Sequence, residues 1–293
     1  LIAGIRSQYW TYNNQVTVSP RATLSYSPGK HKSMTYRFSW GYYHQPPFYR
    51  EFRDISGSLN PEIRAQEAIH YVAGMDYEFS MWKRPFKFVT ELYYKRMNDL
   101  IPFSIDNVRV RYAAENNAVG YAAGIDLRLN GQFVKGTESW ASLSLFRVME
   151  DIEGDGAGYI PRPTDTRFNF AIFFQDHLPN DPSFRITINL YVTGGFPFGA
   201  PGTERKDQVY RAPAYRRVDL GFIKVLKDEG QEKKWDFLNN FRSVWIGLEV
   251  FNLLQTRNTV SYLWVRDIST SRQYAVPNYL TARLINLKLT FKI

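Results

Sequence analysis

The last nine residues of the chain alternate strictly between apolar and polar side chains. The apolar positions are Ile285, Leu287, Leu289, Phe291 and Ile293, and the residues between them are Asn, Lys, Thr and Lys. Because side chains alternate across a β-strand, this segment predicts a strand with one apolar and one polar face. Chain termini usually fray, so such regularity indicates a strand that closes a sheet and turns its apolar face to lipid.

The same period of two recurs along most of the chain and predicts an all-β protein. About twelve segments show it, most near the roughly 9–11 residues of a tilted membrane strand. They include 34–42, 69–79, 86–94, 121–130, 168–175, 184–192 and 244–251. No run approaches the roughly 18 consecutive apolar residues that a membrane helix needs. We therefore expect a transmembrane antiparallel up-and-down β-barrel, in which the last strand pairs with the one near Val244–Phe251.

The connections between these segments alternate between short turns and long loops, which is typical of an outer-membrane barrel. The short turns are expected at Ser27–Lys30, Lys83–Pro85, Gly131–Thr137 and Pro179–Pro182. The long loops run roughly over 45–66, 102–119, 150–166, 195–214 and 256–278. Loops longer than about 12–15 residues are uncommon in compact soluble domains and are often functional.

Charged residues share the face opposite the apolar one, as expected for a polar barrel lumen. They are Arg37, Asp76, Glu78, Lys87, Glu91, Asp126, Arg128, Arg185, Arg217, Asp219 and Glu249. A soluble β-sandwich that exposes this face to water is the alternative. Aromatic residues near strand ends are expected to form interfacial girdles: Tyr42, Tyr43, Trp82, Phe86, Tyr93, Tyr94, Trp235 and Phe237.

Several other classes of function find no support in the sequence. The net charge of +9 comes from scattered lysines and arginines, so no nucleic-acid partner is expected. The chain has no cysteine, and His31, His44, His70 and His177 lie far apart. No nucleophile elbow or phosphate-binding glycine loop appears, so we expect no enzyme, no catalytic residue and no cofactor. His70 is expected to face inward, which leaves a barrel hydrolase possible but without specific support.

An acidic stretch over 150–155 with nearby glycines could surround a calcium ion. The spacing does not fit an EF-hand, because Arg162 stands where the bidentate glutamate belongs. A solvated loop without a metal is the favoured interpretation.

Tyrosine and arginine dominate the long loops, and these residue types are enriched at binding hot spots. Loop packing and interfacial anchoring are the alternative roles for each of them. The candidate ligand-binding residues in the loops and lumen are Tyr49, Arg53, Arg109, Arg111, Tyr159, Arg162, Tyr210, Tyr262 and Trp264.

Several segments resemble the TonB-dependent outer-membrane transporters. They are Pro20–Pro28, Trp40–Pro47, Leu59–Pro61, Gly136–Trp140, Tyr159–Asp165 and Phe251–Leu254. The resemblance covers essentially the whole chain and implies a location in the Gram-negative outer membrane. It also implies a plug domain, a TonB-type energising protein and a barrel of 22 strands. We therefore interpret residues 1–293 as the carboxyl-terminal part of such a barrel, without the plug domain and the amino-terminal strands.

The resemblance suggests two functions, and a third interpretation does not depend on the resemblance. In the first, the loops and lumen bind a scarce nutrient, such as a metal chelate, glycan or peptide, for import through a plugged lumen. In the second, the chain is a non-transporting structural or docking barrel subunit that contacts a surface lipoprotein or other outer-membrane subunits. Both place the chain among outer-membrane lipid, the remaining barrel strands and the plug. The third interpretation is a complete twelve-stranded pore or lipase-like barrel.

Overall fold

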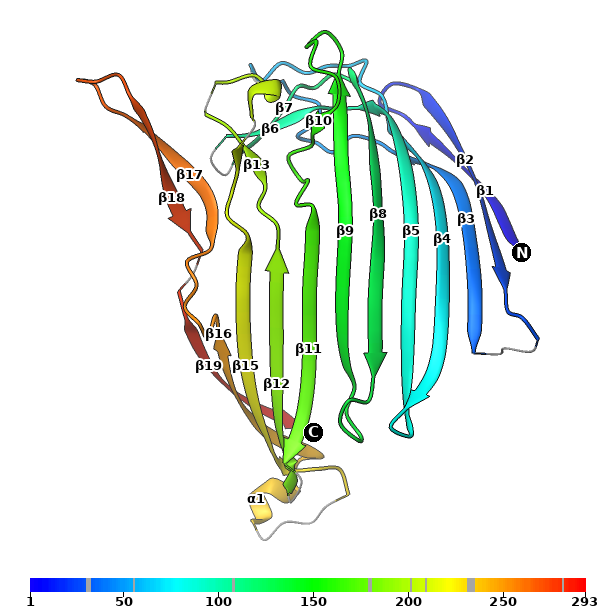
Figure 1. Cartoon of the computed structure of the whole chain (residues 1–293), viewed down its shortest axis with the longest axis vertical. Coiled ribbons are helices and arrows are strands. Elements are labelled where there is room, and N and C mark those ends of the chain that lie inside the picture. The colour runs from blue at the N-terminus through cyan, green and yellow to red at the C-terminus, as the bar shows by residue number, and fades with distance from the viewer. Residues whose placement is uncertain are drawn as a thin grey trace.

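The computed structural model describes residues 1–29, 33–54, 56–106, 109–178, 181–200, 202–208, 210–230, 235–280 and 282–293. Twelve strands form one antiparallel sheet and follow one another in chain order (Figure 1). They are β1 (Ile2–Trp10), β2 (Gln15–Tyr26), β3 (Met34–Gln45), β4 (Gln66–Met81), β5 (Arg84–Leu100), β8 (Ala118–Gly131), β9 (Ser139–Ile152), β11 (Phe168–Leu178), β12 (Asp181–Thr193), β15 (Tyr215–Lys227), β16 (Ser243–Phe251) and β19 (Leu284–Lys292). The predicted strand number and up-and-down order are confirmed. Closure into a barrel of 22 strands stays a prediction.

Smaller elements lie in the connections. They are β6 (Phe103–Asp106), β7 (Arg109–Tyr112), β10 (Ile160–Pro161), β13 (Pro197–Phe198), the 3-10 helix η1 (Arg205–Asp207), β14 (Tyr210–Arg211), α1 (Asp236–Asn239), β17 (Thr259–Arg266) and β18 (Gln273–Tyr279). Except for α1, all of these gather at one end of the sheet (Figure 1). No helix in the described ranges is long and apolar enough to cross a membrane.

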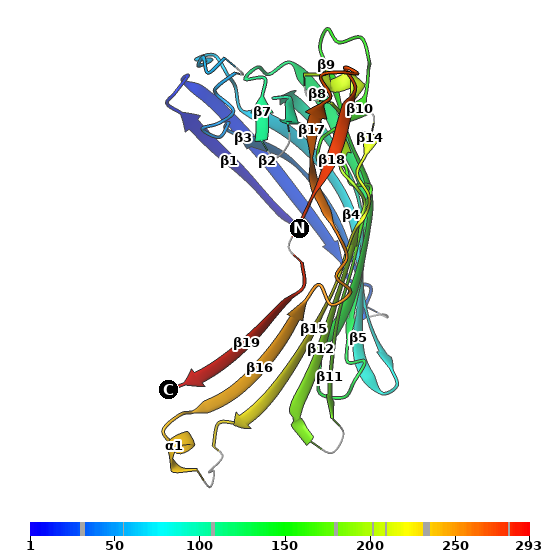
Figure 2. The ribbon, with the colours of Figure 1, turned by 90° about the vertical axis from the view of Figure 1, so that its left-hand side faces the viewer.

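The sheet is a curved wall, and its two outermost strands bend toward the same side (Figure 2). The strands pair in a register that aligns the apolar residues of neighbouring strands on one face of the sheet and the polar residues on the other. On one face, Phe38 pairs with Ala73, Ala73 with Leu92, and Leu92 with Ile125. The neighbouring row, on the other face, begins Arg37–Gly74 and continues through Glu91 to Asp126.

All eleven predicted charged positions share the second face, which we call the inner face. Arg37 lies 2.8 Å from Asp76 and 3.3 Å from Glu91, and Lys87 lies 2.9 Å from Asp76. Residues of the apolar outer face stay exposed, for example Leu92 at 61% and Leu287 at 64%. In the described part of the chain no second large sheet packs on that face. The soluble sandwich is therefore wrong.

The pairing of the last strand is confirmed, because β19 joins β16 in register from Ser243–Lys292 to Phe251–Leu284. The strand lengths differ from the prediction. They range from 9 residues in β1 to 17 in β5, rather than staying near the length of the hydrocarbon layer. The two longest strands, β4 and β5, have 16 and 17 residues, more than the roughly 9–11 that cross the hydrocarbon layer.

The short turns are placed nearly as predicted. The turn between β4 and β5 is made by Trp82 and Lys83, which both have positive φ angles of 55° and 60°, as in a tight two-residue hairpin. Arg84 and Pro85 already pair with β4, so this turn is one residue earlier than predicted. The connection from β15 to β16 lies at the same end of the sheet as the short turns (Figure 1). It is longer than those turns and contains α1. Lys30, His31, Pro179 and Asn180 lie outside the described residues.

Alternation also corrects the predicted aromatic girdles. Tyr94 lies on the outer face, but its neighbour Tyr93 lies on the inner one, because adjacent residues of a strand point to opposite faces. Tyr43 likewise faces inward and stacks on His70, with 4.1 Å between the ring centroids. The predicted inward position of His70 is confirmed.

Apart from Val244 of β16, the most deeply buried apolar side chains of the described residues lie in the loop layer. Ile63 and Ile101 are fully buried, and Ala114 is 1% exposed. A single curved sheet has no opposing layer to pack against, so the loops make their own small core. This core gives the loop end a fixed shape.

Candidate ligand-binding site at the loop end

The long connections meet above the inner face at one end of the wall (Figures 1 and 2). They bring the β6–β7 hairpin, β10, the β13–β14 ribbon and the β17–β18 hairpin to this end (Figure 1). All nine predicted site residues lie in these segments or in the β3–β4 loop.

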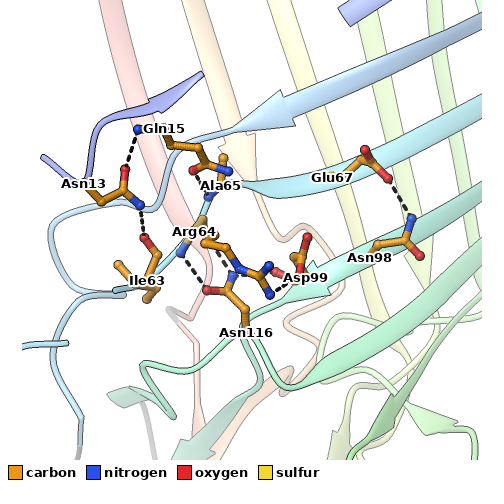
Figure 3. A network of polar contacts seen from close by, with 9 residues as sticks. All are labelled: Asn13, Gln15, Ile63, Arg64, Ala65, Glu67, Asn98, Asp99 and Asn116. Carbon is orange, nitrogen blue, oxygen red and sulfur yellow. Dashed lines mark hydrogen bonds and ion pairs between the residues drawn. The ribbon is translucent and has the colours of Figure 1, made fainter. Parts of the chain in front are cut away.

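A network of polar contacts anchors the β3–β4 loop to its neighbours (Figure 3). Asn116 accepts a hydrogen bond from the Arg64 amide at 2.7 Å and donates to the carbonyls of Arg64 and Asp99 at 3.0 and 2.7 Å. The Arg64 guanidinium pairs with the Asp99 carboxylate at 2.7 Å. On the other side, Gln15 accepts from the Ala65 amide at 2.8 Å. Segments far apart in sequence are thereby held in one layer.

Glu150, at the loop end of β9, is fully buried on the inner face. Arg205 of η1 donates to its Oε1 at 2.8 Å, and the Arg162 Nε lies 3.7 Å from its Oε2. The prediction that the acidic stretch is solvated is therefore wrong for Glu150. Two arginines from different loops offset the cost of burying its charge. Glu153, three residues on, is exposed as predicted.

The Glu150 cluster extends to the β3–β4 loop and β7. Burial lowers the pKa of Arg162, while the nearby carboxylates of Glu150 and Glu51 oppose that shift. Burial also raises the pKa of Tyr112, and the negative charge of Glu51 raises it further. Glu51 is itself 6% exposed and accepts from the Phe48 amide at 2.7 Å. Charged and polar groups from four connections, those of β3–β4, β5–β8, β9–β11 and β12–β15, therefore interact in one cluster.

Asp165 forms a second buried carboxylate between two arginines. It is fully buried and accepts from Arg167 Nε at 2.6 Å and from Arg211 Nη2. Arg211 also donates to the Asp165 carbonyl at 2.6 Å, and the Val148 amide donates to Asp165 Oδ1 at 2.9 Å. Each of the two buried carboxylates therefore faces two arginines, which link separate segments of the loop layer.

An apolar groove of about 250 Å³ lies between the β6–β7, β13–β14 and β17–β18 segments. Its floor includes Phe198, whose ring stacks on Tyr262 with 4.3 Å between centroids and 15° between planes. Tyr210 packs on the opposite strand against Phe198 at 5.7 Å. Ile105, Val110 and Trp264 complete the walls. Such a surface of flat rings and branched side chains suits an apolar or aromatic part of a ligand.

The structure brings some of the predicted site residues together and separates others. Tyr210, Tyr262 and Trp264 converge on the groove. Arg109 and Arg111 adjoin the groove residue Val110 along β7, so strand alternation places their side chains on the face of the β6–β7 hairpin that is turned away from the groove. Arg162 belongs to the Glu150 cluster.

The remaining three predicted residues lie apart from the groove. Tyr49 is 74% exposed, and the guanidinium of Arg53 lies 5.9 Å from its ring centroid, within the β3–β4 loop. Tyr159 packs against Tyr121 at 5.3 Å, and Tyr121 has the register of the outer face. Its place is that of an interfacial aromatic residue.

Sequence reasoning missed the residues that organise this end, namely Glu150, Asp165, Phe198 and Arg205. Phe198 stands in a Gly-Phe-Pro-Phe-Gly stretch that carried no signal for binding. The arginine partner of Glu150 is 55 residues away in sequence, so no local spacing could have found it. Within the described ranges, no three His, Cys, Asp or Glu side chains gather as a metal site.

Comparison with known proteins gives a consistent result. The family described as TonB dependent receptor-like, beta-barrel matches residues 1–280. The siderophore receptor PiuA from Acinetobacter baumannii superposes with a TM-score of 0.66 at 15% identity, covering 95% of this chain and 36% of that one. The ferric-catecholate import receptor Fiu from Escherichia coli K12 gives 0.63 at 15% identity, covering 94% and 35%.

A third solved structure, the outer membrane transporter YddB from Escherichia coli, gives a TM-score of 0.65 at 10% identity and covers 99% of this chain and 43% of that one. The chain thus spans well under half the length of these proteins. Identities this low carry the fold and not the ligand. No curated protein sequence matches the chain.

Proposed function

Since this chain belongs to the family of TonB-dependent receptor β-barrels, which are outer-membrane proteins, we propose that it forms the loop-bearing wall of a nutrient importer. The observation that carries this proposal is the groove at the loop end, where aromatic side chains from separate loops converge. Nutrients of the expected size include metal chelates, glycans and peptides. A metal chelate with aromatic arms is the class whose rings would stack best on the rings of this groove.

The geometry suits partial capture of a ligand. A groove of about 250 Å³ is smaller than the roughly 300–1,000 Å³ that encloses a whole small molecule, so it would hold one apolar or aromatic arm. Phe198, Tyr262 and Trp264 supply the flat contact area that dominates binding hot spots.

Import itself would come from other parts of the receptor. A plug domain in the lumen would transfer the ligand inward, and a TonB-type protein would supply the energy. The charged inner face, with Arg37, Asp76 and Glu91 in one ion-paired cluster, would line the path between wall and plug. None of these steps requires a catalytic residue, so the proposed role is not enzymatic.

The test uses cells that express the full-length receptor and measures uptake of labelled ferric tricatecholate. Phe198→Ala removes the ring on which Tyr262 and Tyr210 pack, and we expect uptake affinity to fall about tenfold, the equivalent of one lost aromatic contact. Tyr274→Ala, an exposed residue of β18 outside the groove, is the matched control. Unchanged affinity in Phe198→Ala, with uptake intact, would contradict the role of the groove.

A specific observation favours the alternative role as a docking subunit. The β17–β18 hairpin projects from the wall (Figure 1) and exposes Ile268 at 95%, Tyr274 at 51% and Leu263 at 48%. Exposed apolar surface of this kind marks protein contacts. Purification of the full-length protein in mild detergent separates the two roles. A stoichiometric protein partner that is lost in Ile268→Asp, without any uptake by the receptor, would favour docking over import.

A further inference from the structure

We propose that the outer face of this wall carries a binding site for one anionic lipid, separate from the nutrient site. An acyl chain would lie in an apolar groove across β2 to β9, and Arg96 and Arg147 would bind the lipid phosphate. The proposal rests on three features of the outer face, namely the groove, the two arginines and the aromatic residues between them. It does not depend on what the receptor imports.

The groove has a volume of about 890 Å³ and is lined almost entirely by apolar atoms. Its central row of outer-face residues runs in register across six strands: Leu24, Phe38, Ala73, Leu92, Ile125 and Leu145. The small side chain of Ala73 sits between the large ones of Phe38 and Leu92, so the row is hollow at β4. A hollow of this form on a lipid-facing surface fits the chain of a lipid.

The next row toward the loops ends in a charge. It contains Trp40, Tyr71, Tyr94 and Ala123, and Arg147 pairs directly with Ala123. One further row up, Arg96 pairs with Tyr121 of β8. The arginines are two strands and two residues apart, which places their Cα atoms roughly 12 Å from each other. Two long, flexible side chains can converge on one phosphate across that distance.

Neither arginine is neutralised by the protein. Arg96 and Arg147 are exposed, and neither has a polar partner among the described residues. Some other charges of the outer face are paired, as in Lys224 with Asp181 and His44 with Glu67. Two unpaired cations above an apolar groove are complementary to a group that carries negative charge above an apolar chain.

Aromatic residues place the two arginines at the level of the lipid headgroups. Tyr121 lies between them and contacts Tyr94 at 6.1 Å and Tyr159 at 5.3 Å. Rings with one polar edge favour the membrane interface at the ends of an apolar belt. A second copy of the same surface would bring four arginines together, so charge repulsion argues against a self-associating interface and favours the lipid.

The first test compares lipids bound to the full-length receptor in neutral detergent by native mass spectrometry. Dipalmitoyl phosphatidic acid is the probe, and dipalmitoylglycerol has the same chains without the phosphate. We expect the phosphatidic acid to bind at a defined stoichiometry and about tenfold more weakly in the double variant Arg96→Gln/Arg147→Gln, since one phosphate contact is worth about that factor. Arg216→Gln, an exposed outer-face arginine of β15 away from the groove, should bind like the unchanged protein.

The second test fills the groove. Ala73→Phe should weaken phosphatidic acid binding, whereas Ala141→Phe, which enlarges an outer-face alanine of β9 outside the groove, should not. Heat-modifiable migration of each variant on a gel confirms that the barrel has formed. Equal binding of both lipids, or an unchanged affinity in both the double arginine variant and Ala73→Phe, would overturn the proposal.

Discussion

Replacing Glu150 with glutamine tests whether buried charge holds the loop layer together. The substitution keeps the side-chain volume and removes the negative charge that faces Arg205 at 2.8 Å and Arg162 at 3.7 Å. Both guanidinium groups are largely buried, with 11% and 13% of their side chains exposed. Removing one partner of a buried ion pair typically costs about 3–5 kcal/mol, because the remaining charge is left without compensation.

We expect Glu150→Gln to lose less than this full free energy, because both arginines keep other partners. Arg205 also donates to the Pro161 carbonyl at 2.6 Å and to Gln208 at 3.1 Å, and Glu51 lies near Arg162. These contacts remain in Glu150→Gln, so we expect a loss of about 2 kcal/mol. The β10 and η1 segments can detach without unfolding the sheet, so the loss should appear as local opening. It corresponds to roughly thirtyfold faster exchange of the amides in these segments.

Hydrogen exchange of the full-length receptor, followed by mass spectrometry, measures this effect. The informative amides are those of Arg162, which donates to the Val148 carbonyl at 2.9 Å, and Gln208, which donates to the Arg205 carbonyl at 3.2 Å. Glu204→Gln is the matched control, because Glu204 pairs with Lys206 at the surface of the same loop. Exchange that accelerates equally in both variants, or in neither, would refute the argument that Glu150 fixes the loops.

Two further predictions concern the last strand and the tip of the β17–β18 hairpin. Leu287→Arg places a charge on the outer face and should cost about 2–4 kcal/mol near the membrane centre, whereas Asn286→Arg on the inner face should be tolerated. Outer-membrane yield and heat-modifiable migration measure this difference, and equal yields would show that the faces are assigned wrongly. At the hairpin tip, hydrogen bonds from Ser269 and Thr270 lower the pKa of Asp267 to about 2. The tip should therefore be ordered above the ordinary aspartate pKa of 3.8 and loosen as the pH falls toward 2, and its exchange in Asp267→Asn should not show this pH dependence.

The wall of the protein was predictable because a strand has only two faces. A shift of one residue in register would move every apolar side chain of a strand to the other face, so the pattern of the sequence determines the pairing of each strand. That logic predicts Arg37, Glu91 and Asp126 on one face, and the register of the strands shows that they also lie in one row. The alternation of side chains does not indicate where a strand ends, because in β5 it continues over 17 residues, beyond the length that crosses the membrane. Strand lengths were therefore underestimated.

The sequence predicted which residue types lie at the loop end, but not which residues contact one another there. The abundance of aromatic residues and arginines in the loops predicted Tyr262, Trp264 and Arg162 as site residues. Tyr262 and Trp264 line the groove, and Arg162 lies in the buried cluster around Glu150. Whether a given arginine binds a ligand, a carboxylate or a lipid depends on contacts between loops that are distant in sequence. Arg162 and Tyr159 stand three residues apart, yet one is buried beside Glu150 and the other packs near the outer face.

The same distinction applies to the positive charge of the chain, whose net charge is +9. Arginines such as Arg205 and Arg211 are bound to buried carboxylates of the loop layer, where they hold separate segments together. Arg96 and Arg147 have no such partner in the described ranges of the chain and lie on the outer face. Among the described residues, positive charge that is divided in this way lies on separate surfaces rather than in one continuous patch. It acts instead as separate local sites, and the variants of Glu150 and of the two outer arginines should therefore affect loop exchange and lipid binding independently.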